Sequence, residues 1–264
     1  MEPRVLQNEI TGQGEPLVLV PGGLTGWLSW IPHAERLSAT RRVIRVQPIH
    51  NELGSNGIPG DPTYTAETER EALRMTLDEL RIDRADFAGW SGGGRALIEF
   101  ALAYPERIRS LTLVEPAAYW ILEQLESRLV RELDELNGFI HDLAGTEVTE
   151  DALAHFLVIA GFASTAEEAK RNPAWERWLP HRMALSWQSK ELDRSGRSVG
   201  ELAAIGFRVL LVKGTTTTEW EKRVVDELGT RIPAARVVEL EGDHASHIQS
   251  IDRFLEELEV HLRA

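Results

Sequence analysis

Short apolar runs separated by longer amphipathic stretches are the main pattern along this chain. Most runs have four or five residues and are rich in branched aliphatic side chains, which is typical of strands buried on both faces of a parallel sheet. We predict strands at residues 17–20, 43–46, 85–88, 111–114, 209–212 and 236–240.

Helical patterns lie between most of these runs. In residues 66–81, Leu73, Leu77 and Leu80 fall on one face of a helix. Residues 248–262 have the same spacing of apolar side chains near the end of the sequence. Strands that alternate with helices in this way favour an α/β fold with a doubly wound, mostly parallel sheet.

One segment, residues 118–202, interrupts that alternation. It contains helical patterns at 121–136, 150–159 and 165–171 but no convincing strand. We therefore predict an all-helical cap, inserted between two strands of the sheet. The remaining residues, 1–117 and 203–264, form the predicted core.

Composition narrows the possible partners. The 264 residues carry a formal net charge of −13, which argues against nucleic acid and anionic membranes as partners and favours solubility. The absence of cysteine excludes disulfides, thiol nucleophiles and thiolate metal sites. No apolar run approaches a membrane span, and the first residues lack a signal-peptide core. We expect a cytoplasmic location and leave the oligomeric state open.

A Gly-x-Ser-x-Gly motif at residues 89–93, Gly-Trp-Ser-Gly-Gly, lies between a predicted strand and a predicted helix. This is the pattern of a nucleophile elbow, in which a sharp turn exposes the serine hydroxyl. The adjoining glycines leave room for that turn, and the helix N-terminus favours developing negative charge. The simpler alternative is a serine in an ordinary glycine turn.

Together with two other segments, this motif resembles the α/β-hydrolase fold family over nearly the whole chain. The family carries a glycine-rich loop after an early strand, followed by a tryptophan; here residues 21–26 and Trp30 match. Residues 242–244, Gly-Asp-His, resemble the Gly-x-His loop that follows the last strand of the family. The resemblance implies a hydrolase with a serine nucleophile.

Two segments depart from the family pattern. Residues 47–54 read Gln-Pro-Ile-His-Asn-Glu-Leu-Gly, where the family usually has Asp-x-x-Gly-x-Gly-x-Ser. We expect a different loop shape there, from which His50 could line the cleft. After the strand at 209–212, the position of the family's acid holds Thr217.

Four residues are the candidates for the central chemistry. Ser91 is the candidate nucleophile, and it needs an imidazole within hydrogen-bond reach. His244 is the best candidate base, since it follows a strand end and matches the family motif; His247 is less suitable, and most other histidines are interpreted as structural. The backbone N–H groups of Gly23 and Gly92 are expected to form the oxyanion hole.

The acid that orients the base is the open question. Thr217 could accept a hydrogen bond but cannot offset a positive charge. Glu115, at the end of the strand at 111–114, is our candidate, and a role as a mere strand-ending contact is almost as plausible. Glu219 is a weaker candidate at a helix start, and the side chain of Asp243 is expected to point elsewhere.

The eight tryptophans give the clearest indication of substrate. All map to loops beside the strand ends or to the cap, and we select Trp30, Trp90 and Trp120 as substrate-binding candidates. Large aromatic side chains also simply fill the interface between cap and core. Even so, the distribution predicts an apolar, aromatic-lined pocket for a neutral hydrophobic molecule.

The favoured hypothesis is a serine hydrolase that cleaves an ester, lactone or similar small substrate through an acyl-enzyme. No motif for a phosphate loop or a metal site occurs, so we expect no cofactor and no metal. A ligand-binding or sensor protein on the same fold remains an alternative, suggested by the missing aspartate. Perhydrolase or carbon–carbon hydrolase chemistry cannot be separated from ester hydrolysis by sequence.

Overall fold

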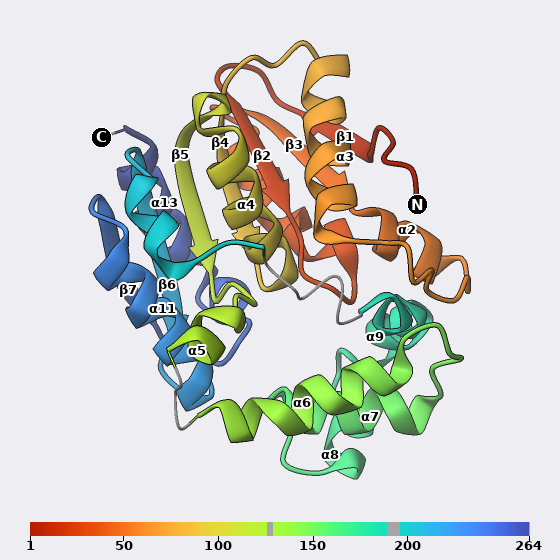
Figure 1. Ribbon diagram of the computed structural model, residues 1–264. Coiled ribbons are helices and arrows are strands. Elements are labelled where there is room, and N and C mark those ends of the chain that lie inside the picture. The colour runs from red at the N-terminus through yellow and green to blue at the C-terminus, as the bar shows by residue number, and fades with distance from the viewer. Residues whose placement is uncertain (126–128, 189–195, 264) are drawn as a thin grey trace.

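The computed structural model describes residues 1–125, 129–188 and 196–263, and its centre is a seven-stranded sheet (Figure 1). The strand order is β1-β3-β2-β4-β5-β6-β7, with β1 antiparallel to β3 and all other neighbouring pairs parallel. The strands are β1 (Gln7–Thr11), β2 (Pro16–Val20), β3 (Arg42–Gln47), β4 (Ala85–Trp90), β5 (Ile108–Val114), β6 (Arg208–Gly214) and β7 (Ala235–Leu240). The predicted mostly parallel α/β sheet is confirmed.

Strand β1 has no counterpart among the sequence-based predictions. Its sequence is Gln-Asn-Glu-Ile-Thr, and none of its residues is buried. It pairs only with β3 and forms one edge of the sheet. An edge strand of this kind lacks the buried apolar run by which central strands are detected.

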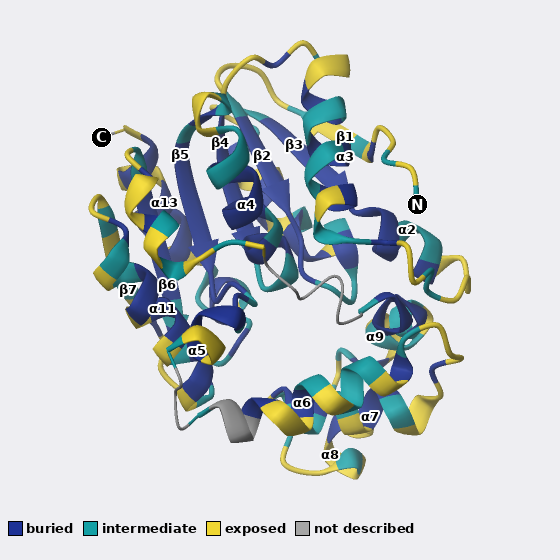
Figure 2. Cartoon of the chain, viewed as in Figure 1, coloured by how far each residue is buried: buried dark blue, intermediate teal, exposed yellow. Residues whose placement is uncertain are grey.

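The central strands are buried on both faces, which Figure 2 shows as dark blue ribbons. In β2, Leu17 and Leu19 pack into one hydrophobic core, and Val18 and Val20 into another. This alternation follows from the two-residue period of a strand. The first core includes α1 (Ile31–Leu37) and α13 (Ile251–Arg263), and the second includes α3 (Ala66–Glu79), α4 (Gly92–Ala103) and α11 (Glu219–Arg231).

Between β5 and β6 the described residues form helices joined by loops, and no strand occurs among them. In Figure 1, α6, α7 and α8 lie apart from the sheet, facing the carboxyl ends of its strands. A small hydrophobic core of their own includes Leu153, Leu157 and Trp175. The helices are α5 (Trp120–Gln124), α6 (Val130–Leu143), α7 (Glu150–Ile159), α8 (Ala166–Arg171), α9 (Trp175–Trp178) and the 3-10 segments η3 (Leu179–Trp187) and η4 (Val199–Ala204).

The helical patterns predicted for this insertion correspond closely to its helices, with one exception. The pattern at 121–136 is divided between α5 and α6, and its residues 126–128 lie outside the described part of the chain, as do residues 189–195 of the predicted cap. The pattern at 150–159 coincides with α7.

The departure at residues 47–54 is a helix, α2 (Ile49–Ser55), which begins after Pro48. It packs against η3 of the insertion so closely that a Cβ on Gly54 would lie 2.5 Å from the backbone of Ala184. His50 therefore lies in a buried helix and not in a loop. Its Nδ1 is 3.2 Å from the hydroxyl of Tyr64, and it does not line the large cavity described below.

Candidate active site

A sharp turn at Ser91 joins β4 to α4. Ser91 has φ 52° and ψ −120°, a conformation that non-glycine residues rarely adopt and that is often found at active sites. The helix can start so close to the sheet because position 93 has no side chain. A Cβ on Gly93 would lie 2.4 Å from the carbonyl oxygens of Val20 and Pro21. This is the strand–turn–helix geometry expected of the elbow motif.

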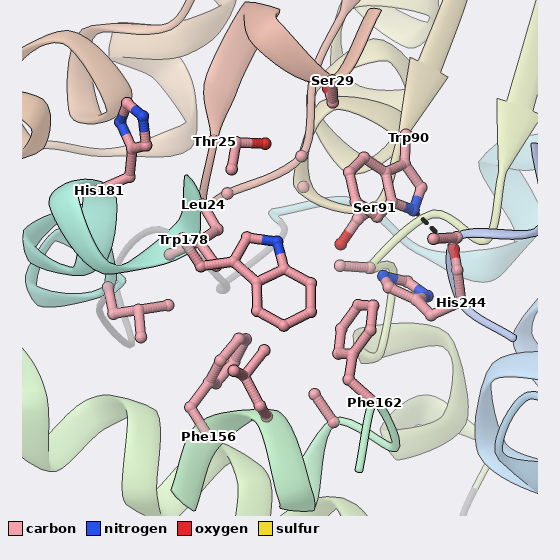
Figure 3. A pocket seen from close by; sticks show the side chains of 18 of the residues that line it. Leu24, Thr25, Ser29, Trp90, Ser91, Phe156, Phe162, Trp178, His181 and His244 are labelled. Atoms are coloured by element: carbon pink, nitrogen blue, oxygen red, sulfur yellow. Dashed lines mark hydrogen bonds between the residues drawn. The ribbon is translucent and has the colours of Figure 1, made fainter. Parts of the chain in front are cut away.

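The hydroxyl of Ser91 points into a cavity of about 550 Å³ between the strand ends and the helical insertion. Figure 3 shows the His244 ring on the same side of the cavity, with Phe162 beside it and Trp178 across from Ser91. Phe156, Phe162 and Trp178 all come from the insertion. The core therefore supplies Ser91 and His244, and the insertion supplies much of the apolar wall.

The candidate oxyanion-hole residues lie beside the nucleophile. Gly23 and Gly92 both line the cavity, and a Cβ on Gly92 would lie 3.9 Å from the amide nitrogen of Gly23. Gly92 is the first residue of α4, where backbone N–H groups have no acceptor in the preceding turn. The structure thus brings the loop after β2 and the start of α4 together next to Ser91.

Glu115 reaches His244 from the end of β5. Its Oε2 is 2.8 Å from His244 Nδ1, and its Oε1 accepts a 2.6 Å hydrogen bond from the backbone N–H of Gly214. Glu115 is buried and has φ 37°, a backbone conformation that non-glycine residues rarely adopt. With Nδ1 held by a carboxylate, Nε2 is the ring nitrogen that remains for the serine.

A second carboxylate, which the sequence interpretation missed, also contacts His244. Glu221 of α11 places Oε1 2.6 Å from His244 Nδ1. Thr217, at the family's acid position, donates its hydroxyl to Glu115 Oε2 at 2.9 Å and also contacts Glu221. The candidate that was considered on this helix, Glu219, is 76% exposed and pairs with Lys222. The available signal was helical spacing: Glu221 follows Thr217 by one helical turn.

The two carboxylates dominate the electrostatics of His244. Burial alone lowers its pKa, but the charge of Glu221 and the hydrogen bonds with Glu115 and Glu221 raise the pKa of His244 to about 10. Burial, together with the charge of Glu221, raises the pKa of Glu115 above its ordinary value. Although burial opposes it, His244 keeps the pKa of Glu221 below its ordinary value.

These three side chains also form a group that could in principle hold a metal ion. Their ligand atoms lie within 4.8 Å of one another, and all three residues are buried. Hydrogen-bond distances already join the His244 nitrogen to both carboxylates. We therefore attribute the arrangement to orientation of the histidine.

The three tryptophans selected as substrate-binding candidates have different positions. Trp90 lines the cavity, and its indole N–H donates a 2.8 Å hydrogen bond to the backbone carbonyl of His244, the dashed line in Figure 3. Trp30 and Trp120 are not among the lining residues; both are buried in hydrophobic cores. Sequence placed both near strand ends but could not show which way the rings turn. Trp178 and Trp220 line the cavity instead.

The other titratable residues near the histidine loop have different positions, and Asp243 lines the cavity with its carboxylate held within its own segment. Asp243 accepts hydrogen bonds from the Ala245 N–H and the Gln249 side chain, each at 2.8 Å. His247, in the short helix α12 (Ser246–Gln249), is fully buried and does not line the cavity. His181, interpreted as structural from sequence, does line it.

Comparison with known proteins agrees with this architecture. A family model described as alpha/beta hydrolase fold matches residues 15–175, which is more than half of the chain. The chain therefore belongs to the α/β-hydrolase fold family. The enol-lactonase of Burkholderia xenovorans LB400 superposes with a TM-score of 0.73 at 23% identity, over 98% of this chain and 96% of that one.

Similar sequences include hydrolases of several kinds. A 2-hydroxy-6-oxo-2,4-heptadienoate hydrolase of Pseudomonas putida is 37% identical over 106 residues, 39% of this chain and 38% of that protein. A pimeloyl-[acyl-carrier protein] methyl ester esterase of Aeromonas hydrophila is 27% identical over 94% of this chain and 95% of that protein. The matches to the first curated relatives span only about half of those proteins or less, between 38% and 53%.

Proposed function

We propose that this protein is a serine hydrolase that cleaves the ester, lactone or similar bond of a small hydrophobic molecule through an acyl-enzyme. One observation carries the proposal. Ser91 and His244 line the same cavity. Ser91 lies in a strained turn, and the Nδ1 of His244 contacts the buried carboxylate of Glu115. That combination is the recurring arrangement for activating a serine hydroxyl.

In the proposed reaction, Ser91 Oγ attacks the carbonyl carbon while His244 Nε2 takes the hydroxyl proton. The N–H groups of Gly23 and Gly92 stabilise the oxyanion, and Glu115 stabilises the imidazolium. His244 then returns the proton to the leaving group, which departs and leaves Ser91 acylated. Water, deprotonated by His244, releases the acyl group and restores the serine.

The cavity lining supports a hydrophobic substrate. Phe156, Phe162 and Trp178 line a volume suited to a small molecule, with Phe162 beside His244 and Trp178 across from Ser91. Charged residues also line the cavity. Glu176 and Arg177 are sequence neighbours of opposite charge. Arg95 pairs with Glu69 at 2.8 Å, and Asp243 accepts a hydrogen bond from Gln249. We propose a neutral acyl or aromatic compound.

A fluorophosphonate probe tests the nucleophile directly. We expect the probe to label the wild-type protein at Ser91 and to leave Ser91→Ala unlabelled. Ser29→Ala is the matched control, because Ser29 lines the same cavity but donates its hydroxyl to the carbonyl of Gly26 at 2.8 Å. Absence of labelling in the wild type, with a hydrophobic ligand still raising the melting temperature, would favour the sensor alternative.

Carbon–carbon bond hydrolysis is a second candidate, favoured by the relatives rather than by geometry. Two of the similar sequences are hydrolases named for 2-hydroxy-6-oxo-2,4-heptadienoate and 2-hydroxymuconate semialdehyde. Parallel assays with p-nitrophenyl esters and with a 2-hydroxy-6-oxo-dienoate separate the candidates. The better substrate is the one with the higher kcat/KM, and both activities require Ser91.

We further propose that residues 118–202 act as a cap over a core formed by 1–117 and 203–264, and that the protein works in the cytoplasm. The cavity between insertion and strand ends supports the first statement. Among the described residues, no helix is both long and apolar enough to cross a bilayer.

A further inference from the structure

Glu221 makes the shorter of the two carboxylate contacts with His244, yet it is not the residue that sequence reasoning assigns to this role. Its Oε1 lies 2.6 Å from Nδ1, against 2.8 Å for Glu115 Oε2. Its side chain is 3% exposed, and the residue lines the cavity that contains Ser91. Such burial is unusual for a glutamate without a partner.

The ordinary explanation for Glu221 is a carboxylate in the first turn of a helix, which interacts favourably with the helix dipole. Thr218 caps α11, and its hydroxyl donates to Glu221 Oε2 at 3.1 Å. Glu219 lies in the same turn and can interact with the same helix dipole, yet its side chain is 76% exposed. Glu221 instead extends inward to the histidine, so capping alone does not explain its position.

Thr217 connects the two carboxylates. Its hydroxyl contacts both Glu115 and Glu221 but has only one hydrogen to donate. Both contacts can be hydrogen bonds only when one carboxyl group is protonated and donates to the Thr217 oxygen. Two buried carboxylates this close also disfavour simultaneous ionisation. Burial and the charge of Glu221 raise the pKa of Glu115, which makes Glu221 the carboxylate that more readily keeps its charge.

We propose that Glu221 is a positioning residue that shares the Nδ1–H of His244 with Glu115, so that both carboxyl groups hold the imidazolium formed in the reaction. The catalytic part of this inference rests on the proposed hydrolase function. The link between Glu221 and His244 does not, and it can be measured separately. Thr217 occupies the position of the family's acid and carries no charge. The negative charge beside His244 therefore comes from Glu221, one helical turn later, and from Glu115, at the end of β5.

The surroundings of His244 contain few other charges. Asp243 is held by Ala245 and Gln249. The rings of Trp90 and Phe162 lie 5.5 and 5.6 Å from the His244 ring and carry no charge. Among the described residues, the titratable groups that act on His244 are Glu115 after β5, Glu221 of α11 and His247 of α12, and Asp243 precedes it in the chain.

The first test is an NMR pH titration of the His244 ring, assigned by its loss in His244→Asn. We expect Glu221→Gln to move the titration midpoint of His244 to lower pH by about one to three units, since a neighbouring opposite charge is lost. Glu219→Gln, on the same helix, is the matched control and should leave the midpoint unchanged. A midpoint in Glu221→Gln equal to that of the wild type would overturn the inference.

Glu115→Gln tests whether Glu221 interacts with His244 once the charge of Glu115 is removed. This test does not require Glu221→Gln to fold. If Glu221 also holds the ring, His244 in Glu115→Gln should still titrate above the ordinary value of 6.5. A return to the ordinary value would show that Glu115 alone holds the histidine, and the inference would fail.

Turnover gives the third measurement. We expect each single glutamine variant to lower the pH-independent kcat/KM, measured at a pH where the His244 ring is neutral, by about 10- to 100-fold, and the double variant to lower it by about 10⁴-fold, the loss seen when a triad loses its carboxylate. If Glu115→Gln alone causes the full loss, Glu221 has no catalytic role. Failure of Ser91 to react with the fluorophosphonate would reject the hydrolase function, whereas the titrations would still decide whether Glu221 holds His244.

Discussion

His244 and His247 are three residues apart, and both rings lie near that of Trp90, yet their surroundings are opposite. The Trp90 ring is 5.5 Å from the His244 ring and 4.8 Å from the His247 ring. His244 has two carboxylates at its Nδ1. Neither ring nitrogen of His247 has a hydrogen-bond partner among the described residues.

The difference follows from what each ring packs against. The His247 ring lies among Trp30, His33 and Phe254, where burial and the nearby histidines hold its pKa well below the ordinary value. Burial also lowers the pKa of His33 to about 4. The carboxylates instead raise the pKa of His244 to about 10. The surroundings thus favour the protonated form of His244 and the neutral form of His247.

Replacing each of these two histidines by a side chain that cannot titrate should give the largest difference in activity. We expect His244→Asn to lower kcat/KM for an activated ester by about 10⁴-fold or more, the loss typical of removing a triad base. His247→Phe should stay within a few-fold of the wild type. Steady-state kinetics, with circular dichroism as the check on folding, measures both. Comparable losses in the two variants would contradict the division of roles.

Activity and pH should follow the protonation of His244. Only the neutral ring can accept the Ser91 proton, and the pKa of His244 is raised to about 10. We therefore expect kcat/KM to rise by about tenfold per pH unit above pH 7 and to level off near the raised pKa. Rates corrected for spontaneous hydrolysis of the ester measure this. A plateau already reached at pH 7 would contradict it.

Stability should depend on pH in the acidic range through the other two histidines. The pKa values of His33 and His247 are lowered in the folded protein, so their contribution is present above pH 6.5 and is lost as pH falls toward 4. His247→Phe should remove about 2 kcal/mol of the stability lost by pH 5. Urea unfolding at pH 7 and pH 5 tests this, with the exposed His155→Gln as the control. Parallel losses in wild type and His247→Phe would refute it.

Trp90→Phe should have the smallest effect, because an aromatic ring remains near both histidines. The variant loses the hydrogen bond from the indole N–H to the His244 carbonyl. We expect a loss of about 1 kcal/mol in stability and a drop in kcat/KM of less than about tenfold. Thermal unfolding and kinetics on the same ester give both values. No change in either would mean that the indole bond does not fix the histidine loop.

Sequence reasoning could locate candidate residues that belong to a local motif, and their roles stay predictions. Ser91 and His244 each lie in a short segment whose strand and loop can be read directly, and Glu115 follows a strand end. Glu221 could not be found in the same way, because only the packing of α11 directs it inward while Glu219 of the same turn is exposed. The orientation of the Trp30 ring could not be predicted from sequence either, because packing directs it into the hydrophobic core.

The division of the cavity between two parts of the chain has a further consequence. Ser91, His244 and both carboxylates come from the core, whereas Phe156, Phe162 and Trp178 come from the insertion. We expect that exchange of the segment between α6 and η3 would change which molecules fit and leave Ser91, His244 and the carboxylates in place. Substitutions in the insertion could therefore alter substrate specificity without altering the residues of the core that line the cavity.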